Sequence, residues 1–448
     1  MEVLVMVGQL LLGLTILVGL HEWGHFIAAR IFGIRVNKFY IFFDFLFPLP
    51  NVLNFALWKK KKGDTEYGLG WFPMGGYVDI EGMIDETKDS SKLAAEPQPY
   101  EFRAKPAWQR LIVMLGGIIV NIVLGVLIFW ALTFKAGENY ISMKEVNKLG
   151  IVAYPVAQEI GLKTGDKIVN VSGKPIDRFA DLRGSDVILG ENVYFTVDRN
   201  GKTLEIPIPN DLIEKVSDED SEGFIEPIET FSVGEVVPDL PAAKAGIETE
   251  DRILAFNGKP VHYYHEYKEM ADAHTGEKVN LTVLRGSDTL AISPTLTEDG
   301  KLGFQAMPDM KMEHIDLGLA QSFGIGAGRA FSVISDNIRG FKKIFSGQVA
   351  AGKALAGPVG IARKFYGGVW LWTRFFMITG MLSMALAFIN LLPIPALDGG
   401  HAVILLYEMI SGRKPSEKFM ERTQQIGMVI LLSLMAWVLF NDAVQALF

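Results

Sequence analysis

Cysteine is absent from this 448-residue chain, and charged residues make up only 21% of it. Without cysteine the protein cannot form disulfide bonds or thiolate metal sites, so any catalysis must use other side chains. Acidic and basic residues are interspersed and the net charge is -8, so the chain lacks the basic surface that nucleic acid requires. We therefore expect no nucleic-acid partner. The length suggests roughly two to three domain-sized units.

Long apolar runs are the main feature that the sequence does have, and hydrophobic residues make up 49% of it. A helix needs about 20 apolar residues to cross a hydrocarbon layer of roughly 30 Å. Four stretches approach or exceed that length, at residues 3–20, 111–134, 375–392 and 423–440. A cleaved signal peptide is the alternative for the first stretch, but it has no basic leader and no small-residue cleavage site. The sequence therefore predicts a membrane protein with four spans.

Lysine and arginine are concentrated in two of the connections between these spans. The third connection, between the last two spans, contains four such residues within residues 413–422, and the first connection contains eleven within residues 30–105. Loops rich in lysine and arginine stay on the cytoplasmic side. We therefore expect both connections to be cytoplasmic, the long segment from about residue 135 to 366 to lie outside the cytoplasm, and both termini to share one side.

The long external segment contains an internal repeat. Residues 161–176 align with residues 246–261 through a shared pattern of Gly, Asp, an apolar run and Gly-Lys-Pro. A period of roughly 85 residues is one small domain, and the short alternating apolar runs broken by Gly and Asn predict strands. After the repeats, apolar residues recur at helical spacing from Leu319 to Phe345. This amphipathic helix is expected to pack on the second repeat, with the membrane surface or a substrate as alternative partners.

The chemistry is predicted to lie inside the membrane, at the end of the first span. His21 and His25 are four residues apart, so a helix places both imidazoles on one face, and Glu22 follows the first histidine. This His-Glu-x-x-His pattern supplies two metal ligands and a nearby base. Ionisable groups at membrane depth are costly and are usually retained for function. The alternative is a hydrogen-bonded structural histidine pair.

Catalytic zinc sites keep three protein ligands and one open position, so a third ligand is needed. Asp398 is the candidate, in a segment that also contains Pro393 and Pro395 and is followed by two glycines. The prolines should break the third span, and the glycines should permit unusual backbone angles, so we expect Asp398 on irregular backbone that turns inward. The predicted topology brings this segment to the same side as the histidines.

Together, the intramembrane His-Glu-x-x-His motif, the distant Asn390-x-x-Pro-x-Pro-x-Leu-Asp-Gly-Gly motif and the paired repeats resemble the site-2 protease family over nearly the whole chain. The repeats themselves resemble PDZ domains, which bind extended peptides at a sheet edge, with a spacer role as the alternative. The implied fold is an α+β polytopic membrane protein with four transmembrane helices, a membrane-associated β region and two tandem PDZ domains. The implied boundaries are 1–34 (first span), 35–108 (β region and loop), 109–135 (second span), 136–222 and 223–310 (PDZ domains), 311–366 (amphipathic helical region), 367–395 (third span), 396–422 (Asp398 segment and loop) and 423–448 (fourth span).

This resemblance implies a zinc metalloendopeptidase that cuts within the transmembrane segments of single-span proteins. It implies Zn²⁺ bound by His21, His25 and Asp398, with Glu22 as the general base. Asn390, Pro393 and Pro395 would contribute to substrate binding. The implied partners are an anti-sigma factor, remnant signal peptides and the lipid bilayer. The implied location is a bacterial inner membrane, with periplasmic PDZ domains and an active site near the cytoplasmic side.

Residues 66–80 have a strand-like pattern that includes Gly68 and Gly70. We expect this segment to offer an edge to an unwound substrate, because a helical substrate hides its carbonyl groups in its own hydrogen bonds. Residues 41–50, just before it, form an apolar segment that is longer than the corresponding family region.

Two other functional classes compete with the protease. A peptide-binding scaffold would use the repeats with a structural metal site, but such a site needs no adjacent base like Glu22 and is normally closed by four ligands. A metal transporter would need further intramembrane carboxylates. Of the remaining histidines, His262 and His265 are expected to have surface roles, while His401 could either support the site or only donate hydrogen bonds.

Overall fold

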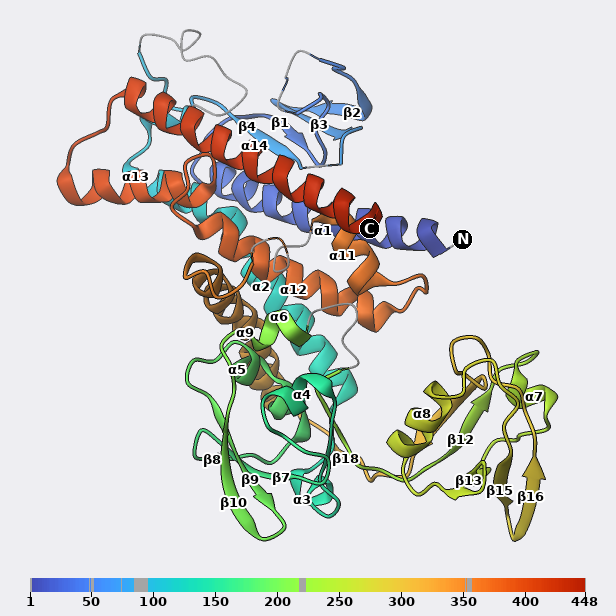
Figure 1. The fold of residues 1–448 in the computed structure, drawn as a ribbon. Coiled ribbons are helices and arrows are strands. Elements are labelled where there is room, and N and C mark those ends of the chain that lie inside the picture. Colours follow the sequence, from blue (N-terminus) through green and yellow to red (C-terminus); the bar gives the residue numbers. More distant parts are fainter. Residues whose placement is uncertain are drawn as a thin grey trace. The chain divides into compact units, whose positions relative to one another are not determined.

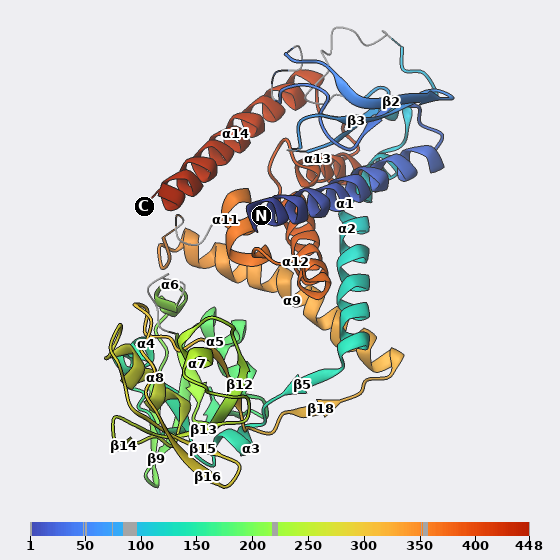
Figure 2. The same cartoon turned by 90° about the vertical axis from the view of Figure 1, so that its right-hand side faces the viewer.

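The computed structural model describes residues 2–47, 49, 52–73, 75–83, 96–216, 223–350, 352 and 357–447, and every structural statement below concerns these residues. The chain forms two compact units, which are described separately (Figure 1, Figure 2). The first unit joins Met1–Gly137 with Asp316–Phe448, and the second is Glu138–Ile315.

Four helices of the first unit are long and apolar enough to cross a membrane, which confirms the predicted number of spans. The first helix continues well past its apolar run, so the His-Glu-x-x-His motif lies within one unbroken helix. These helices are α1 (Glu2–Ile31), α2 (Ala107–Ala136), α12 (Trp372–Leu391) and α14 (Glu417–Leu447).

Helix α2 lies at the centre of this unit and packs against α1, α12 and two further helices. Its crossing with α1 brings backbone against backbone. A Cβ added to Gly24 of α1 would lie 2.3 Å from the carbonyl oxygen of Gly116 on α2. Only glycine permits helices to approach this closely, and the crossing places the motif of α1 directly against α2.

Within the first unit the amphipathic helix α9 (Leu319–Phe345) packs on α2 and α12. The expected packing on the second repeat stays a prediction. The buried residues of α9 include a stripe of small side chains, Ser322, Gly326 and Ala330, spaced four residues apart. This stripe lets α9 approach the backbone of α2 at Trp130, where a Cβ on Gly326 would lie 2.7 Å from the Trp130 Cα. Because the side chains of this stripe are small, α9 can pack closely against another helix, here α2.

A four-stranded sheet follows α1 in the sequence and packs on its second half. The strand order is β2-β3-β1-β4, in which only the β1–β3 pair is parallel. Strand β3, which contains Gly68 and Gly70, is therefore an interior strand and cannot offer an edge, contrary to expectation. Within residues 66–80 it is β4 that lies at an edge. The strands are β1 (Val36–Tyr40), β2 (Ala56–Lys62), β3 (Thr65–Gly70) and β4 (Tyr77–Ile80).

The segment after α12 contains a helix that the sequence analysis did not predict, α13 (Asp398–Ser411). It packs on α2, and Arg110 of α2 forms an ion pair with Glu408 of α13. Both side chains of this pair are largely buried. The connection that was expected to be a loop is therefore partly a helix fixed to the centre of the unit.

In the second unit each repeat has its own hydrophobic core and its own four-stranded sheet (Figure 1). The sheets have the orders β10-β9-β7-β8 and β14-β13-β15-β16, and each repeat adds a two-stranded pair, β11-β6 and β12-β17. The first repeat contains β6 (Ile151–Ala153), β7 (Lys167–Val171), β8 (Lys174–Pro175), β9 (Tyr194–Arg199), β10 (Lys202–Pro207), β11 (Ile225–Pro227), α3 (Met143–Val146), α4 (Pro155–Glu159), α5 (Ser185–Ile188) and α6 (Leu212–Val216). The second contains β12 (Phe231–Val236), β13 (Arg252–Phe256), β14 (Lys259–Pro260), β15 (Leu281–Arg285), β16 (Asp288–Ile292), β17 (Phe304–Pro308), α7 (Pro241–Lys244) and α8 (Tyr264–Asp272). Strands β5 (Glu138–Tyr140) and β18 (Glu313–Ile315) pair where the chain enters and leaves this unit.

The aspartates of the repeated motif occupy equivalent positions in the two repeats. Asp166 accepts two hydrogen bonds from Arg199, and Asp251 accepts two from Arg285. Burial alone would raise the pKa of Asp251, but the hydrogen bonds from Arg285 outweigh it and hold the pKa below its usual value. Both aspartates are buried, so each repeat depends on its own carboxylate–guanidinium pair.

The connection between the two repeats contains Glu229, whose side chain is half-buried. Burial and the nearby carboxylates of Glu226 and Asp309 raise the pKa of Glu229 to about 7. This connection is therefore a place where the second unit responds to pH near neutrality.

Candidate metal centre

The structure brings Asp398 next to His21 and His25, although Asp398 lies far from both histidines in the sequence. The Nε2 atoms of the two histidines are 3.3 Å apart. The Oδ2 atom of Asp398 lies 3.3 Å from the Nε2 of each histidine. Both histidines are buried and Asp398 is nearly so, which makes this a compact triangle of three donor atoms.

This triangle fits the donor set of a zinc ion. Tetrahedral zinc binds histidine nitrogen and carboxylate oxygen at about 2.0–2.2 Å, which places neighbouring ligand atoms about 3.3–3.5 Å apart. The observed separations are 3.3 Å. Oδ2 of Asp398 is also buried without a hydrogen-bond partner among the described residues, and a buried acceptor of this kind needs a compensating ligand. Three protein ligands leave a fourth position open, as catalytic zinc sites require.

Two contacts from α2 orient the imidazole rings. Nδ1 of His25 lies 2.8 Å from the carbonyl oxygen of Val113, to which its N–H can donate. That tautomer leaves Nε2 of His25 as a bare lone pair facing the triangle. On the other ring, Nδ1 of His21 lies 3.1 Å from the side-chain amide of Asn121, which is fully buried.

Gly117 provides the space in which both rings lie. A Cβ on this residue would lie 2.5 Å from Cε1 of His21 and 2.5 Å from Nε2 of His25. Gly117 and Asn121 of the second span are among the residues that resemble the family, but no role in the site was predicted for either. Their spacing of four residues on one helix is the signal that could have found them, because it matches the spacing of the two histidines.

Asp398 is the first residue of α13, and not part of irregular backbone as expected. The unusual backbone angle is at Ala396, with φ of 81°, two residues earlier. Gly399 and Gly400 are helical and buried, and a Cβ on Gly399 would lie 2.3 Å from the carbonyl oxygen of Leu392. The glycine pair therefore permits close packing of α13 on the preceding segment, and this packing fixes Asp398 beside the histidines.

The predicted substrate-binding residues lie in three different places. Asn390, in the last turn of α12, has its Nδ2 atom 3.3 Å from Nε2 of His21, so it belongs to the cluster. Pro393 and Pro395 lie in the connection between α12 and α13, where a Cβ on Gly427 of α14 would come 1.8 Å from the Pro395 carbonyl oxygen. Pro395 is thus a contact point for the last span.

Gly68 and Gly70 lie in a different environment, beneath other parts of the β region. A Cβ on Gly68 would lie 2.2 Å from the ring of Tyr40, and one on Gly70 would lie 2.1 Å from the Phe43 carbonyl oxygen. Both glycines are buried by these neighbours. Their lack of a side chain is explained by packing.

The other histidines that the sequence analysis singled out lie elsewhere. His262 is exposed, and its backbone N–H donates to the Glu266 carboxylate at the start of α8. His265 stacks on Tyr263, with ring centroids 5.8 Å apart. His401 lies in α13, one turn after Asp398.

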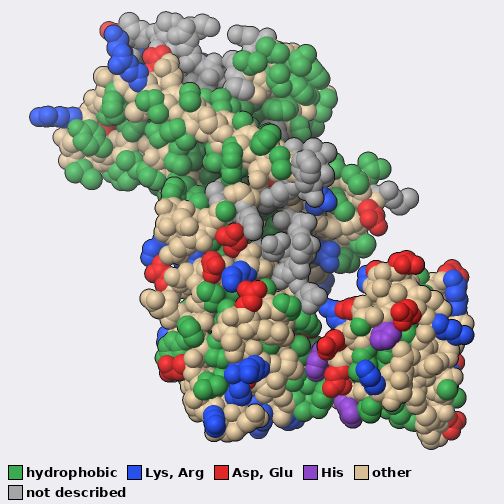
Figure 3. Space-filling model, viewed as in Figure 1, with side chains coloured by type: hydrophobic (Ala, Val, Ile, Leu, Met, Phe, Trp, Pro, Cys, Tyr) green, Lys and Arg blue, Asp and Glu red, His purple; other side chains and the backbone are tan. Residues whose placement is uncertain are grey.

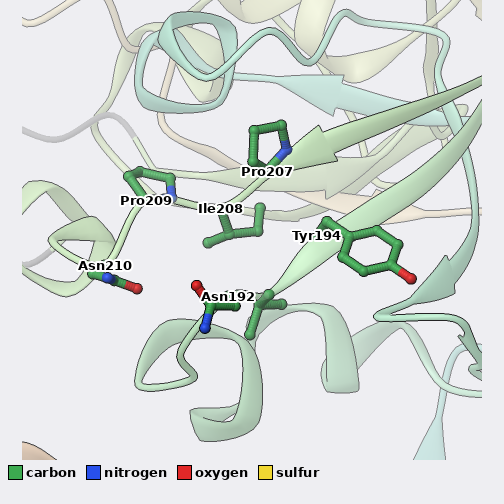
Figure 4. Close-up of a pocket in the computed structure, with 7 residues that line it drawn as sticks. Asn192, Tyr194, Pro207, Ile208, Pro209 and Asn210 are labelled. Atoms are coloured by element: carbon green, nitrogen blue, oxygen red, sulfur yellow. The ribbon is translucent and has the colours of Figure 1, made fainter.

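A pocket of about 340 Å³ lies in the first repeat, where the strands β9 and β10 meet (Figure 4). Figure 4 shows Asn192 and Tyr194 on one side of it and Pro207 to Asn210 on the other. Its lining has no carboxylate, histidine or lysine, so it offers no acid–base or metal chemistry comparable with that of the cluster in the first unit.

Comparison with known proteins agrees with this geometry. The model of the family described as peptidase family M50 matches residues 9–434. The chain is 27% identical to a Neisseria meningitidis protein named "Putative zinc metalloprotease", over 97% of this chain and 98% of that protein. It is 26% identical to the regulator of sigma E protease of Haemophilus influenzae, over 97% of this chain and 98% of the relative. The regulator of sigma-E protease of Salmonella typhimurium is also 26% identical, over 96% and 97%.

Proposed function

Because the chain belongs to peptidase family M50 and is a membrane zinc metalloprotease, we propose that it cleaves peptide bonds within the membrane-spanning segments of single-span proteins. The observation that carries this proposal is the triangle of His21, His25 and Asp398, which is built on a membrane-spanning helix. A peptide bond can reach ligands at this depth only if its own segment enters the membrane. The scaffold and transporter alternatives do not account for the family match.

In the proposed mechanism, His21, His25 and Asp398 hold the zinc ion and Glu22 acts as the general base. When bound, zinc supplies a Lewis acid that acidifies water and polarises a carbonyl group. Glu22 is half-buried and follows His21 on the same helix. It takes a proton from the attacking water and delivers it to the departing amide nitrogen.

The residues around the triangle have positioning roles in this proposal. The Val113 carbonyl accepts the Nδ1–H of His25 and keeps its Nε2 available as a ligand. Asn121 does the same for His21 when its amide oxygen faces Nδ1, because that oxygen then accepts the ring N–H. Asn390 lies beside the open position, where its amide N–H can donate to a substrate carbonyl.

A substrate helix must unwind before its carbonyl groups can be attacked. We propose that the unwound segment pairs with the end of β4 at Tyr77 and Val78. This end adjoins α1, since a Cβ on the preceding Gly76 would lie 2.8 Å from Val18, one turn before His21. Strand addition of this kind supplies backbone hydrogen bonds for an extended peptide. A proline scan of residues 76–78 that left cleavage unchanged would count against this role.

The repeats, we propose, are two tandem PDZ domains within residues 136–310, which recognise peptides or restrict access of large substrates. The boundary between them lies after β11 and not at residue 222 as expected, because β11 pairs with β6 of the first repeat. Their matching strand orders and their equivalent Asp–Arg pairs support a common fold. The lysine and arginine content of the span connections supports periplasmic repeats and a site near the cytoplasmic side of a bacterial inner membrane. Two relatives are named as regulators of sigma E, which favours an anti-sigma factor as substrate. Remnant signal peptides, which the family resemblance implies, are a second proposed group.

The test combines cleavage with metal analysis. Purified protein in detergent is incubated with a tagged single-span substrate, and zinc content is measured in the native protein and in Glu22→Gln. We expect cleavage by the native protein only, with zinc retained in both, because the substitution removes the base and leaves the three ligands. Cleavage by both proteins would overturn the role of Glu22, and absence of zinc from the native protein would overturn the proposed ligands.

A further inference from the structure

The β region has an exposed surface along β2 that is apolar at one end and basic at the other. The apolar tip consists of six exposed hydrophobic residues at the start of β2 and in the segment before it. The basic strip is Lys59–Lys62, which forms the rest of β2. The tip residues are Leu49, Val52, Leu53, Phe55, Leu57 and Trp58, which are 39–64% exposed.

Contacts beneath the apolar tip hold its backbone in place. Phe43 and Phe45 are buried beneath it, and Phe43 pairs with Phe72 as a β-bridge. Trp71 donates from Nε1 to the Leu53 carbonyl over 2.9 Å, and its ring stacks on Phe55 at 5.5 Å. These contacts hold the backbone of the tip in place. In this conformation the hydrophobic side chains of the tip are exposed. The apolar segment of residues 41–50 thus forms the base of the tip, with Pro48 and Pro50 outside the described residues.

Helix α1 sets the depth of this surface. Strand β1 runs back along α1, so that Ile41 lies against Gly19, and a Cβ there would be 3.8 Å from the Ile41 side chain. At the other end of the sheet the Thr65 hydroxyl donates to the Val36 carbonyl, beyond the last turn of α1. Strand β2 spans the same distance, with Lys62 opposite Thr65. The tip therefore lies at the level of the apolar part of α1, and the lysines lie toward its end.

No ion pair neutralises the basic strip within the part of the chain that the structure describes. Among the described residues, Lys59–Lys62 form no ion pair, and all four are exposed. Glu66 lies opposite Lys61 in the sheet, but its carboxylate accepts a hydrogen bond from the Tyr40 hydroxyl. At about 3.3 Å per residue along the strand, Lys62 lies about 13 Å from Trp58. This length is comparable with the distance between the acyl chains and the phosphate layer of a bilayer.

Figure 3 shows hydrophobic side chains gathered over the part of the molecule where Figure 1 draws β2 and β3. A surface with an apolar end and an adjoining row of lysines matches the interface of an anionic membrane, in which Trp favours the headgroup level. We propose that the apolar tip inserts among the acyl chains and that Lys59–Lys62 bind the phosphates of anionic lipids in the same leaflet. The surface thereby fixes the depth of the sheet, and with it β4, relative to the site.

The experiment uses the full chain in lipid nanodiscs and the fluorescence of Trp58. Quenching by lipids brominated on the acyl chains is measured for the native protein and for Trp58→Phe, and the difference isolates Trp58 from the other seven tryptophans of the eight in the chain. Brominated phosphatidylglycerol is compared with brominated phosphatidylcholine at equal mole fraction. The preference for phosphatidylglycerol at Trp58 reports anionic lipid beside the strip.

We expect Trp58 to be quenched by both lipids, with phosphatidylglycerol more effective. Replacing Lys59–Lys62 with glutamine should reduce this preference at least about fivefold, the effect of one lysine at a membrane surface, while quenching itself persists. The matched control replaces four cations with glutamine, two between α13 and α14 and two in the first turns of α14, and should leave the preference at Trp58 unchanged. Those cations are Arg413, Lys414, Lys418 and Arg422.

Two results would overturn the proposal. If neither brominated lipid quenched Trp58, the tip would face water or be covered by an acidic partner protein instead of lipid. If quenching occurred but the four-lysine variant kept its preference for phosphatidylglycerol, the strip would not select anionic lipid. Both readouts are independent of proteolysis, so they stand whether or not the proposed cleavage activity is found.

Discussion

Replacing Gly117 with alanine tests whether the fit between α2 and the two imidazole rings controls the site. The added Cβ would lie 2.5 Å from Cε1 of His21 and from Nε2 of His25, whereas ordinary contacts begin at 3.4 Å. The rings would have to move by about 0.9 Å. They have little freedom to do so, because Val113 and Asn121 hold their other nitrogens.

A misplacement of about 1 Å at a reacting group can reduce catalysis about 100-fold. Disturbing residues that orient metal ligands reduces metal affinity about 10- to 100-fold. We therefore expect Gly117→Ala to lose cleavage of a single-span substrate by about 100-fold and to retain less zinc after dialysis against a weak chelator. Helix stability should not be the cause, since alanine is favoured over glycine within a helix by about 1 kcal/mol.

Gly328→Ala is the matched control for this experiment. Gly328 lies in α9, is exposed, and has no atom within 4 Å of an added Cβ. This variant makes the same chemical change within a helix and should keep native zinc content and cleavage. If Gly117→Ala also kept both within about twofold, the rings would have room to adjust, and the argument from packing would be refuted.

Three further outcomes follow from other parts of the structure. Asp398→Asn removes one charged ligand atom at nearly constant size, so zinc content measured by mass spectrometry should fall at least about tenfold; unchanged zinc would exclude Asp398 as a ligand. Asp251→Asn leaves Arg285 without its buried partner. This change should therefore lower the free energy of unfolding of the second unit by about 3 kcal/mol in denaturant titrations. The same change at the exposed Asp288 should have little effect. The pKa of Glu229 is raised to about 7 in the folded protein, so its ionisation destabilises the fold as pH rises from its unfolded value of 4.5 through 7. Glu229→Gln should therefore unfold at a higher temperature than the native protein at pH 8 but at the same temperature at pH 4, and a difference that did not depend on pH would contradict the assigned pKa.

The features that the sequence predicted correctly depend on local periodicity. The histidines of α1 are separated by one helical turn, so any helix brings them to one face, and the apolar run before them makes that helix membrane-spanning. The internal repeat was visible because matching residues keep the same spacing. Its aspartates, Asp166 and Asp251, proved to have the same buried arginine contacts.

The features that the sequence left undetermined or predicted wrongly depend on which surfaces meet. Helix α9 has an amphipathic pattern, but the pattern alone does not identify the partner, and its small stripe at Gly326 fits the α2 backbone. The strand pattern around Gly68 was also recognised, yet the position of β3 inside the sheet results from its parallel pairing with β1. Pairing partners are not encoded in the alternation of a single strand.

Glycine explains why the geometry of the site was the hardest feature to predict. A glycine can provide either unusual backbone angles or an absent side chain, and the sequence does not distinguish these two uses. Gly399 was expected to serve the first purpose but serves the second, while the left-handed angle falls on Ala396. Gly24 and Gly117 likewise give α1 and α2 the closeness that places two imidazoles against a helix backbone. Each of these absences has meaning only opposite a particular neighbour. The sequence therefore predicts the ligands His21, His25 and Asp398, but the packing that positions them is visible only once the crossing of α1 and α2 is known.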